Sequence, residues 1–301
     1  MTIKKLLLAA VAASAFIAPS LLAQDWDAVQ VRSEKVAGNV HVLFGAGGNI
    51  GVSVGDDGVF IVDDQFAPLT EKIKAAIAVL SDQPIRFAIN THFHGDHTGG
   101  NENLGRQGTV IVAHDNVRIR MAAGSFIKAF NNRTEPQEGF ALPVVTYNDQ
   151  AALHLNGEQA RIHHVKNSHT DGDSIIHFEG SNVIHMGDTF FMGIFPFIDV
   201  DNGGSVDGMI ASANKVLGMT TPETRIIPGH GPVTDASGLT LFRDMLIDVR
   251  DRVSAMKADG LSLEDIQASD VLDPHMADFG EEGEAGVNWA RSFVSFVFNS
   301  V

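Results

Sequence analysis

Short runs of apolar residues separated by polar, glycine-rich turns predict most of the strands in this chain. The first three predict a meander of hairpins, and the full set covers residues 40–44, 50–54, 59–62, 85–89, 109–113, 151–155, 160–165, 174–178, 182–185 and 224–227. Apolar residues at helical spacing predict helices within 73–80, 205–217, 239–256 and 289–297. The acidic stretch 278–286 is expected to form a surface loop. Because no linker-like segment interrupts this order, we expect one α/β domain over residues 24–301.

The N-terminus has the pattern of a secretory signal peptide. Lys4 and Lys5 precede an apolar run over residues 6–18, and the small residue Ala23 comes just before a polar segment. The run is shorter than the roughly 20 residues that a membrane-spanning helix needs. We therefore expect residues 1–23 to be cleaved and the mature protein to be periplasmic or secreted, with no membrane anchor after cleavage.

The amino-acid composition excludes several kinds of partner, metal site and nucleophile. The 301 residues include 37 Asp and Glu against 21 Lys and Arg, and the resulting net charge of −16 argues against a nucleic-acid partner. There is no cysteine, which excludes thiolate zinc fingers, cysteine-bound iron–sulfur clusters and thiol nucleophiles. Any metal ion must therefore be bound through nitrogen and oxygen.

The densest group of candidate ligands follows the predicted strand 85–89. His92, His94, Asp96 and His97 lie within six residues of one another. Alternate side chains of an extended segment point the same way, so His92, His94 and Asp96 can converge on one point. Imidazole and carboxylate are the ligands that zinc takes when thiolate is absent. This segment therefore predicts a metal site.

Three further candidates come just after later strands. His169, Asp188 and His230 each lie near Gly, Pro or Ser, in a turn that follows an apolar run. Loops held by a rigid sheet are common positions for functional side chains. Taken singly, each of the three is equally consistent with a structural role.

The order of these motifs resembles that of the metallo-β-lactamase superfamily. Five motifs of that family appear in sequence between about residues 40 and 235: Asp63 or Asp64, the His-x-His-x-Asp-His element at 92–97, His169, Asp188 and His230. The resemblance implies a four-layered αββα sandwich, an α/β fold with the metal site at one edge between two sheets. Residues 24–301 would then form a single metallo-β-lactamase-like domain.

The same resemblance implies two zinc ions and a role for each motif. His92, His94 and His169 would bind the first ion, Asp96, His97 and His230 the second, and Asp188 would bridge both. Iron or manganese also fits nitrogen and oxygen ligands, but the His-x-His start differs from the Glu-containing variant of di-iron relatives. The early aspartate is structural in that family and supports the site through its loop.

Such a site indicates hydrolysis. Two zinc ions that share a water lower its pKa to near neutrality, so that hydroxide attacks the amide or ester carbonyl of a small-molecule substrate. Asp96 is the residue we expect to orient this water and to handle its proton. A serine mechanism is excluded because the sequence contains neither Gly-x-Ser-x-Gly nor Ser-x-x-Lys.

The substrate is less sharply indicated. Hydrolysis of β-lactams is the leading hypothesis for an exported member of this superfamily, although Asp188 and Phe191 stand where one β-lactamase subclass has cysteine and lysine. The alternative is a lactonase or a (thio)ester hydrolase, and a lesser alternative is a mononuclear iron dioxygenase. Glyoxalase II itself is not expected, because it is cytosolic and binds an anionic substrate through basic residues near its C-terminus, which is acidic here.

Four flanking features lead to further hypotheses about the site, and three of them allow two interpretations each. The apolar segment 190–198 is either a substrate wall or ordinary packing, and 45–49 is either a mobile flap or a plain hairpin turn. Residues 125–142 are interpreted as a lid that supplies Lys128 and Arg133 as carboxylate anchors. Three aspartates bind a cation such as calcium or belong to a turn that caps the following helix: Asp199, Asp201 and Asp207.

Overall fold

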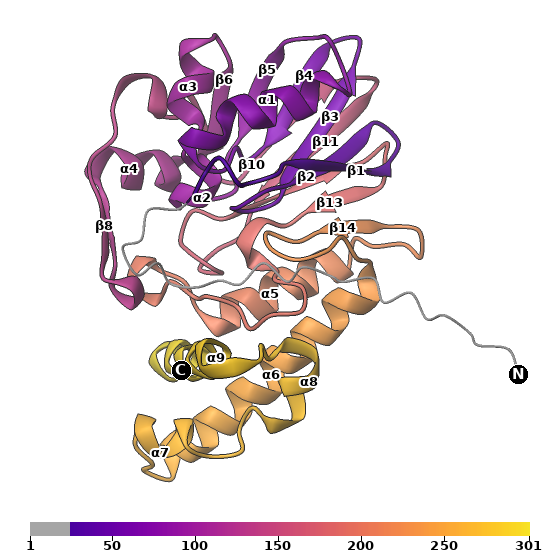
Figure 1. The fold of residues 1–301 in the computed structure, drawn as a ribbon. Helices are drawn as coiled ribbons and strands as arrows, with labels where there is room; N and C mark the ends of the chain where they lie inside the picture. Colours follow the sequence, from indigo (N-terminus) through magenta and orange to yellow (C-terminus); the bar gives the residue numbers. More distant parts are fainter. Residues whose placement is uncertain (1–24) are drawn as a thin grey trace, which may run out of the picture.

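Two β-sheets form the centre of the molecule (Figure 1). The computed structural model describes residues 25–301, so the predicted signal peptide lies outside the described residues. The first sheet has the order β1 (Arg32–Ala37), β2 (Val40–Phe44), β3 (Ile50–Gly55), β4 (Gly58–Val62), β5 (Ile85–Ile89), β6 (Val110–His114) and β9 (Val145–Tyr147). The second has the order β10 (Gln150–Leu155), β11 (Glu158–His164), β12 (Ser174–Phe178), β13 (Val183–His185) and β14 (Arg225–Ile227).

Strand direction changes within each sheet. The predicted meander is present, because β1 to β4 pair antiparallel, and β4, β5, β6 and β9 then run parallel to one another. In the second sheet β10 to β13 are antiparallel, whereas β13 and β14 are parallel. The parallel strands point their carboxyl ends to the same edge of their sheet, where loops are free to carry functional residues.

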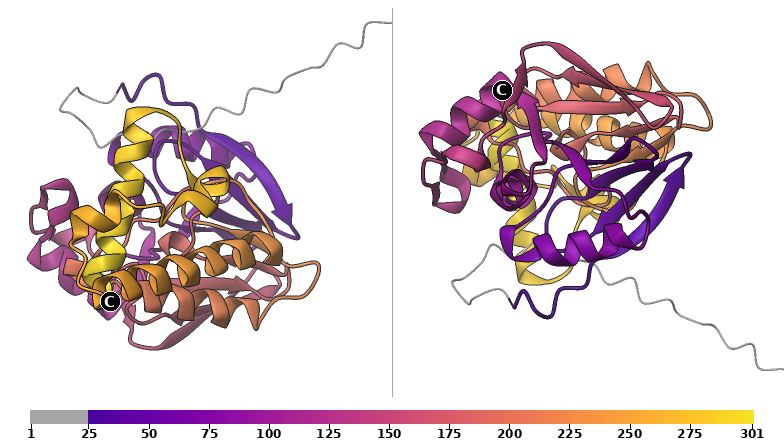
Figure 2. Two further views of the ribbon diagram at one scale, coloured as in Figure 1. Left: turned by 90° about the horizontal axis from the view of Figure 1, so that it is seen from below. Right: turned by 90° about the horizontal axis from the view of Figure 1, so that it is seen from above.

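Helices cover the outer face of each sheet, which confirms the αββα arrangement (Figure 2). On the first sheet lie α1 (Thr70–Ala78) and α3 (Asn101–Arg106), and α2 (Gly95–Thr98) and α4 (Asp115–Ala123) belong to the same half. On the second lie α5 (Val206–Leu217), α6 (Ala236–Ala258) and α9 (Gly283–Ser300), joined by α7 (Leu263–Gln267) and α8 (Met276–Phe279). Among residues 25–301, no helix combines the length and apolar character that crossing a bilayer requires.

Alternation along the strands creates three apolar layers. In β4, Phe60 and Val62 face the second sheet, while Val59 and Ile61 face α1. All four side chains are almost fully buried, so this strand is apolar on both faces. The inner layer between the sheets fixes their relative position, and with it the position of the loops at their shared edge.

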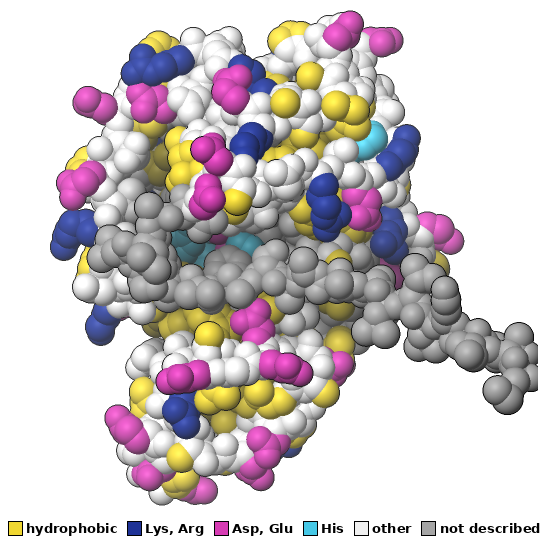
Figure 3. All heavy atoms as spheres, viewed as in Figure 1, with side chains coloured by type: hydrophobic (Ala, Val, Ile, Leu, Met, Phe, Trp, Pro, Cys, Tyr) yellow, Lys and Arg dark blue, Asp and Glu magenta, His cyan; other side chains and the backbone are white. Residues whose placement is uncertain are grey.

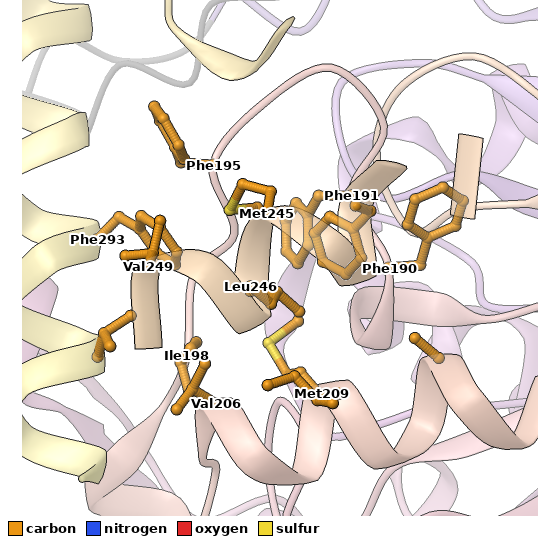
Figure 4. Close-up of a cluster of buried hydrophobic side chains, with 14 of the residues drawn as sticks. Phe190, Phe191, Phe195, Ile198, Val206, Met209, Met245, Leu246, Val249 and Phe293 are labelled. Carbon is orange, nitrogen blue, oxygen red and sulfur yellow. The ribbon is translucent and has the colours of Figure 1, made fainter. Parts of the chain in front are cut away.

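The third apolar layer joins the second sheet to the C-terminal helices. Figure 4 shows the segment that follows Asp188 entering this layer, with Phe190 and Phe195 close to side chains of α5, α6 and α9. The ring of Phe195 stacks on Phe293 of α9, with centroids 5.1 Å apart. The indole Nε1 of Trp289 also donates to the carbonyl oxygen of Phe195, at 2.8 Å. The C-terminal helices therefore hold the chain that leaves Asp188.

The structure departs from the sequence prediction mainly at short or exposed elements. The expectation of a surface loop over 278–286 is wrong at both ends, because α8 extends to Phe279 and α9 begins at Gly283. The glycines there favour a loop locally, but the apolar face of α9 is buried and extends the helix. The small hairpin of β7 (Ser125–Ile127) and β8 (Asn132–Thr134), and the edge strands β1 and β9, lack a clear apolar alternation.

We expect Phe293→Ala to lower the free energy of unfolding by about 3–5 kcal/mol, because it removes a fully buried aromatic ring and leaves a cavity. Val287→Ala on the same helix is the control, since that side chain is 43% exposed and should cost well under about 1 kcal/mol. Urea unfolding of both variants measures the difference. Equal destabilisation would contradict a supporting role for the face of α9 that carries Phe293.

Candidate metal centre

Loops from both sheets bring the candidate ligands to one edge. His92, His94, Asp96 and His97 follow β5, and His169 lies in the connection from β11 to β12. Asp188 lies in a 3-10 turn (Gly187–Thr189) after β13, and His230 follows β14. The sequence thus located these side chains at strand ends, and the fold brings all seven together.

The seven side chains form two groups that meet at one carboxylate. His92, His94, His169 and Asp188 make up the first group, and Asp96, His97 and His230 make up the second. In each group the ligand atoms lie within 4.8 Å of one another. Oδ2 of Asp188 lies 3.6 Å from Nε2 of His169, and Oδ1 lies 3.0 Å from Nε2 of His97 and 3.4 Å from Nε2 of His230. Asp188 therefore faces both groups, as a bridging ligand must.

Hydrogen bonds around His92 determine which of its nitrogens carries the proton. The hydroxyl of Thr91 donates to Oδ2 of Asp63 at 2.8 Å, so its oxygen must accept from Nδ1 of His92, 3.0 Å away. Nε2 of His92 is then an acceptor that is buried without a hydrogen-bond partner. A buried lone pair without a partner is costly, and a cation in the group would satisfy it.

His94 and His169 present the same situation as a pair. Nε2 of His94 lies 2.9 Å from Oδ2 of Asp199, and Nδ1 of His169 lies 2.9 Å from the carbonyl oxygen of Phe197. Both oxygens are acceptors, so each imidazole places its proton there. The remaining nitrogens, Nδ1 of His94 and Nε2 of His169, face each other at 2.9 Å with lone pairs. Only a shared proton or a cation makes that arrangement favourable.

The second group is organised from the opposite side. Nδ1 of His97 lies 2.7 Å from Oδ2 of Asp63, and this contact directs Nε2 of His97 toward Asp188 and Asp96. Nε2 of His230 lies 3.3 Å from Oδ2 of Asp96. Converging imidazole and carboxylate donors in both groups fit a divalent cation of the zinc type.

Electrostatics differ between the two groups. Burial lowers the pKa of His92, and it lowers that of His169 to about 4, so both imidazoles are neutral at pH 7. Burial also acts to lower the pKa of His97 and His230, but the nearby carboxylates outweigh it and raise the pKa of His230 to about 9. Without a metal ion, the second group therefore holds protons at neutral pH.

The apolar segment 190–198 packs behind the imidazoles. Phe191 is 2% exposed and stacks on His230, with ring centroids 5.3 Å apart, and the buried Phe197 stacks on His94 at 5.7 Å. The packing interpretation of these two rings is therefore correct. Met192 and Ile194, between them, are only partly buried.

Two of the three aspartates near α5, Asp199 and Asp207, have separate partners. Asp199 binds His94 and also accepts from Nδ2 of Asn202 at 2.7 Å, and Asp207 pairs with Arg250. Among residues 25–301, no cation-binding group includes any of the three. The predicted helix cap is provided by Ser205, whose hydroxyl accepts from the backbone of Gly208. The contact between Asp199 and His94 spans 105 positions, so no local pattern in the sequence reveals it.

The suggested lid region is a small hairpin packed on aromatic rings. Phe130, between β7 and β8, lies 4.8 Å from the ring of Phe197 and 6.1 Å from that of Trp289. Lys128 and Arg133 are exposed, and Arg133 lies over the ring of Phe126. The hairpin thus contacts the metal centre through Phe197, and the anchoring role of its two cations stays a prediction.

Comparison with known proteins decides the family. The sequence profile of the metallo-beta-lactamase superfamily matches residues 44–233, more than half of the chain. The chain belongs to this superfamily. Membership confirms the predicted family and, with it, the predicted class of metal-dependent hydrolase.

Individual relatives are more distant. A hydroxyacylglutathione hydrolase of Nitrosococcus oceani is 29% identical over 190 residues, which is 59% of this chain and 60% of that protein. The match thus spans less than two thirds of that relative. A metallo-beta-lactamase from Pontibacter korlensis superposes with a TM-score of 0.59 at 18% identity, over 73% of this chain and all of that one. A sec-alkylsulfatase from Pseudomonas gives 0.65 at 16% identity, over 89% of this chain and 50% of that one. Both likenesses establish the fold.

We expect the metal-free protein to lose stability as pH rises from about 6.5 to 9. The pKa of His230 is raised to about 9 and that of buried Asp173 to about 8, so in this window the folded state holds more protons than the unfolded state. For each proton that the folded state holds in excess of the unfolded state, the free energy of unfolding falls by about 1.4 kcal/mol per pH unit. Thermal unfolding with a chelator at pH 6.5 and pH 9 measures the loss. Saturating zinc should reduce the decline, because zinc binding already requires His230 without its proton, and an apo protein equally stable at both pH values would contradict the assignment.

Proposed function

We propose that this protein is a binuclear zinc hydrolase that acts on an ester, thioester or lactone carbonyl. The observation that carries the proposal is Asp188, whose two carboxylate oxygens face the two ligand groups separately. A carboxylate in this position would contribute one oxygen to each of two metal ions, so that no thiolate is needed. The proposed ligands are the two groups described above, with Asp188 common to both.

Bound zinc would supply Lewis acidity and lower the pKa of a water molecule to near neutrality. The protein contributes the arrangement of donors. His92 and His169 stay neutral at pH 7, so their lone pairs are available without a change of protonation. Asp199 and the carbonyl of Phe197 fix the orientation of His94 and His169, which keeps the ligand set rigid.

Asp96 is the proposed catalytic residue. Its side chain is 21% exposed, whereas none of the other six ligand residues exceeds 6%. Burial acts to raise the pKa of Asp96, but the imidazoles of His97 and His230 outweigh it and lower the pKa to about 2. Both imidazole contacts involve Oδ2, which leaves Oδ1 to accept a hydrogen bond from the attacking water. Asp96 would orient that water and receive its proton.

Two observations favour the ester or thioester alternative over β-lactam hydrolysis. Two relatives that match in sequence are hydroxyacylglutathione hydrolases, whose name describes hydrolysis of an acyl group carried by glutathione. Phe191, at the position of the β-lactamase lysine, is buried against His230, so this residue supplies no cation for a drug carboxylate.

The thioester need not be a glutathione conjugate. In the space-filling view acidic side chains are spread over the C-terminal helical region, with few Lys or Arg among them (Figure 3). These negative charges would repel a negatively charged substrate such as a glutathione thioester. We therefore propose that small acyl esters, thioesters and lactones without strong negative charge are the preferred substrates.

A substrate panel tests this proposal with zinc-loaded protein. We expect turnover of an uncharged acyl thioester and of a homoserine lactone, slower turnover of a glutathione thioester, and little or no turnover of a penicillin, a cephalosporin or a carbapenem. Hydrolysis of the β-lactams alone would overturn the ester assignment. Oxygen uptake with one bound iron would overturn the hydrolytic class.

Asp96→Asn should lower kcat on the best panel substrate by at least about 100-fold, because the amide cannot accept the proton. The first ligand group is untouched, so the variant should retain zinc in that group. Asp201→Asn, at an exposed aspartate outside both groups, is the control and should leave kcat unchanged. Steady-state kinetics and metal analysis are measured together, and full activity in Asp96→Asn would refute its role.

A further inference from the structure

The connection between β2 and β3, residues 45–49, is bound through Gly48 and Asn49 to two loops of the metal centre. Three of its five residues are glycine, and none has a positive φ, so backbone conformation does not explain them. Space explains Gly48: a Cβ atom there would lie 2.0 Å from Cε1 of His97. Only glycine lets the backbone approach this imidazole so closely.

Gly48 also links two other residues of the site. Its N–H donates to the carbonyl oxygen of Asp96 at 3.1 Å, and its own carbonyl oxygen accepts from Nε2 of Gln65 at 2.7 Å. Gln65 is fully buried and follows the loop of Asp63. The backbone of residue 48 is therefore fixed against the His-x-His-x-Asp-His segment.

Asn49 binds the opposite side of the centre. Its backbone N–H donates to the carbonyl oxygen of Gly229 at 2.7 Å. Its side-chain amide donates to the carbonyl oxygens of Pro228 and Gly231, at 2.9 and 2.8 Å. Asn49 is only 4% exposed, and its three hydrogen bonds go to residues on both sides of His230 in the sequence. The segment 45–49 is therefore a strap across the two halves and not a free flap.

The strap contacts every member of the second ligand group or the residues next to it. It takes no part in the hydrogen bonds that orient the first group. It meets Asp96 through the backbone, His97 through the ring, and His230 through the flanking carbonyls. The first group is oriented instead by Thr91, Asp199 and Phe197. We propose that Asn49 is a positioning residue that sets the distance of His230 from Asp96 and His97, and so selectively controls metal affinity in the second group. This inference rests on the binuclear site proposed above.

Asn49→Ala tests the proposal, with Asn156→Ala as matched control. Asn156 is also a buried asparagine whose amide donates to two partners, Ser53 and Gly58, and it joins the two sheets at the opposite end of β3. Zinc is titrated against a chromophoric chelator for each protein. We expect Asn49→Ala to bind the first zinc like the wild type and the second at least tenfold more weakly, whereas Asn156→Ala binds both normally. Unchanged binding of the second zinc, or equal weakening of both, would overturn the positioning role.

A second measurement needs no metal. Hydrogen exchange is measured on protein from which metal has been removed with a chelator. It reports directly whether the strap is intact, because the backbone N–H groups of Gly48 and Asn49 donate its hydrogen bonds. In Asn49→Ala, we expect exchange to quicken at least tenfold in residues 45–49 and 228–231 and to stay unchanged in 167–173. Quickening in all three segments, as in general destabilisation, would refute a local role. If wild-type protein binds a single zinc, the binuclear function fails, and the exchange result alone decides the strap.

Discussion

One buried carboxylate determines the proton positions on which both ligand groups depend. Asp63 accepts from the backbone N–H and the hydroxyl of Thr91 at 2.7 and 2.8 Å, and it contacts Nδ1 of His97 at 2.7 Å. Through Thr91 it also fixes the tautomer of His92, so it aims one imidazole in each group. Its backbone φ of +64° is a conformation that non-glycine residues rarely adopt, at a cost of roughly 1–3 kcal/mol. These contacts compensate for that strain.

The other imidazoles depend on the chain that leaves Asp188. Within about ten residues this chain supplies Phe191 against His230, the carbonyl of Phe197 for His169, and Asp199 for His94. It stays in place because the C-terminal helices hold Phe195 by stacking and by the indole of Trp289. Both contacts come from α9, which lies outside the region 44–233 that the family profile matches. The shared fold supplies the candidate ligands, and residues beyond that region support the segment behind them.

The sequence indicated where the candidate ligands lie because most of them closely follow a strand whose apolar pattern is strong, and the structure brings these side chains together. His92 to His97, Asp188 and His230 need only the strand ends to be recognised, and the resemblance to the superfamily then set their order. It also anticipated a supporting role for the early aspartate, but not which residues it would orient. The contacts of Asp199 with His94 and of Asn49 with the loop of His230 were not predicted, because these partners lie 105 and about 180 positions away. Long-range hydrogen bonds leave no periodic trace in a sequence, and α9 was underestimated because burial of its apolar face outweighed its glycine-rich start.

The aromatic rings behind the imidazoles affect the electrostatic field of the centre. Phe191 and Phe197 are buried and exclude water from the inner side of the centre, where the medium is therefore weakly polarisable. The electric field of a charge in the centre therefore extends mainly toward the solvent-exposed side of the centre. Asp96 is the most exposed of the seven candidate ligand residues and lies on that side. The fold thus gives the centre a direction, with an apolar inner side and a solvent-exposed side that carries Asp96.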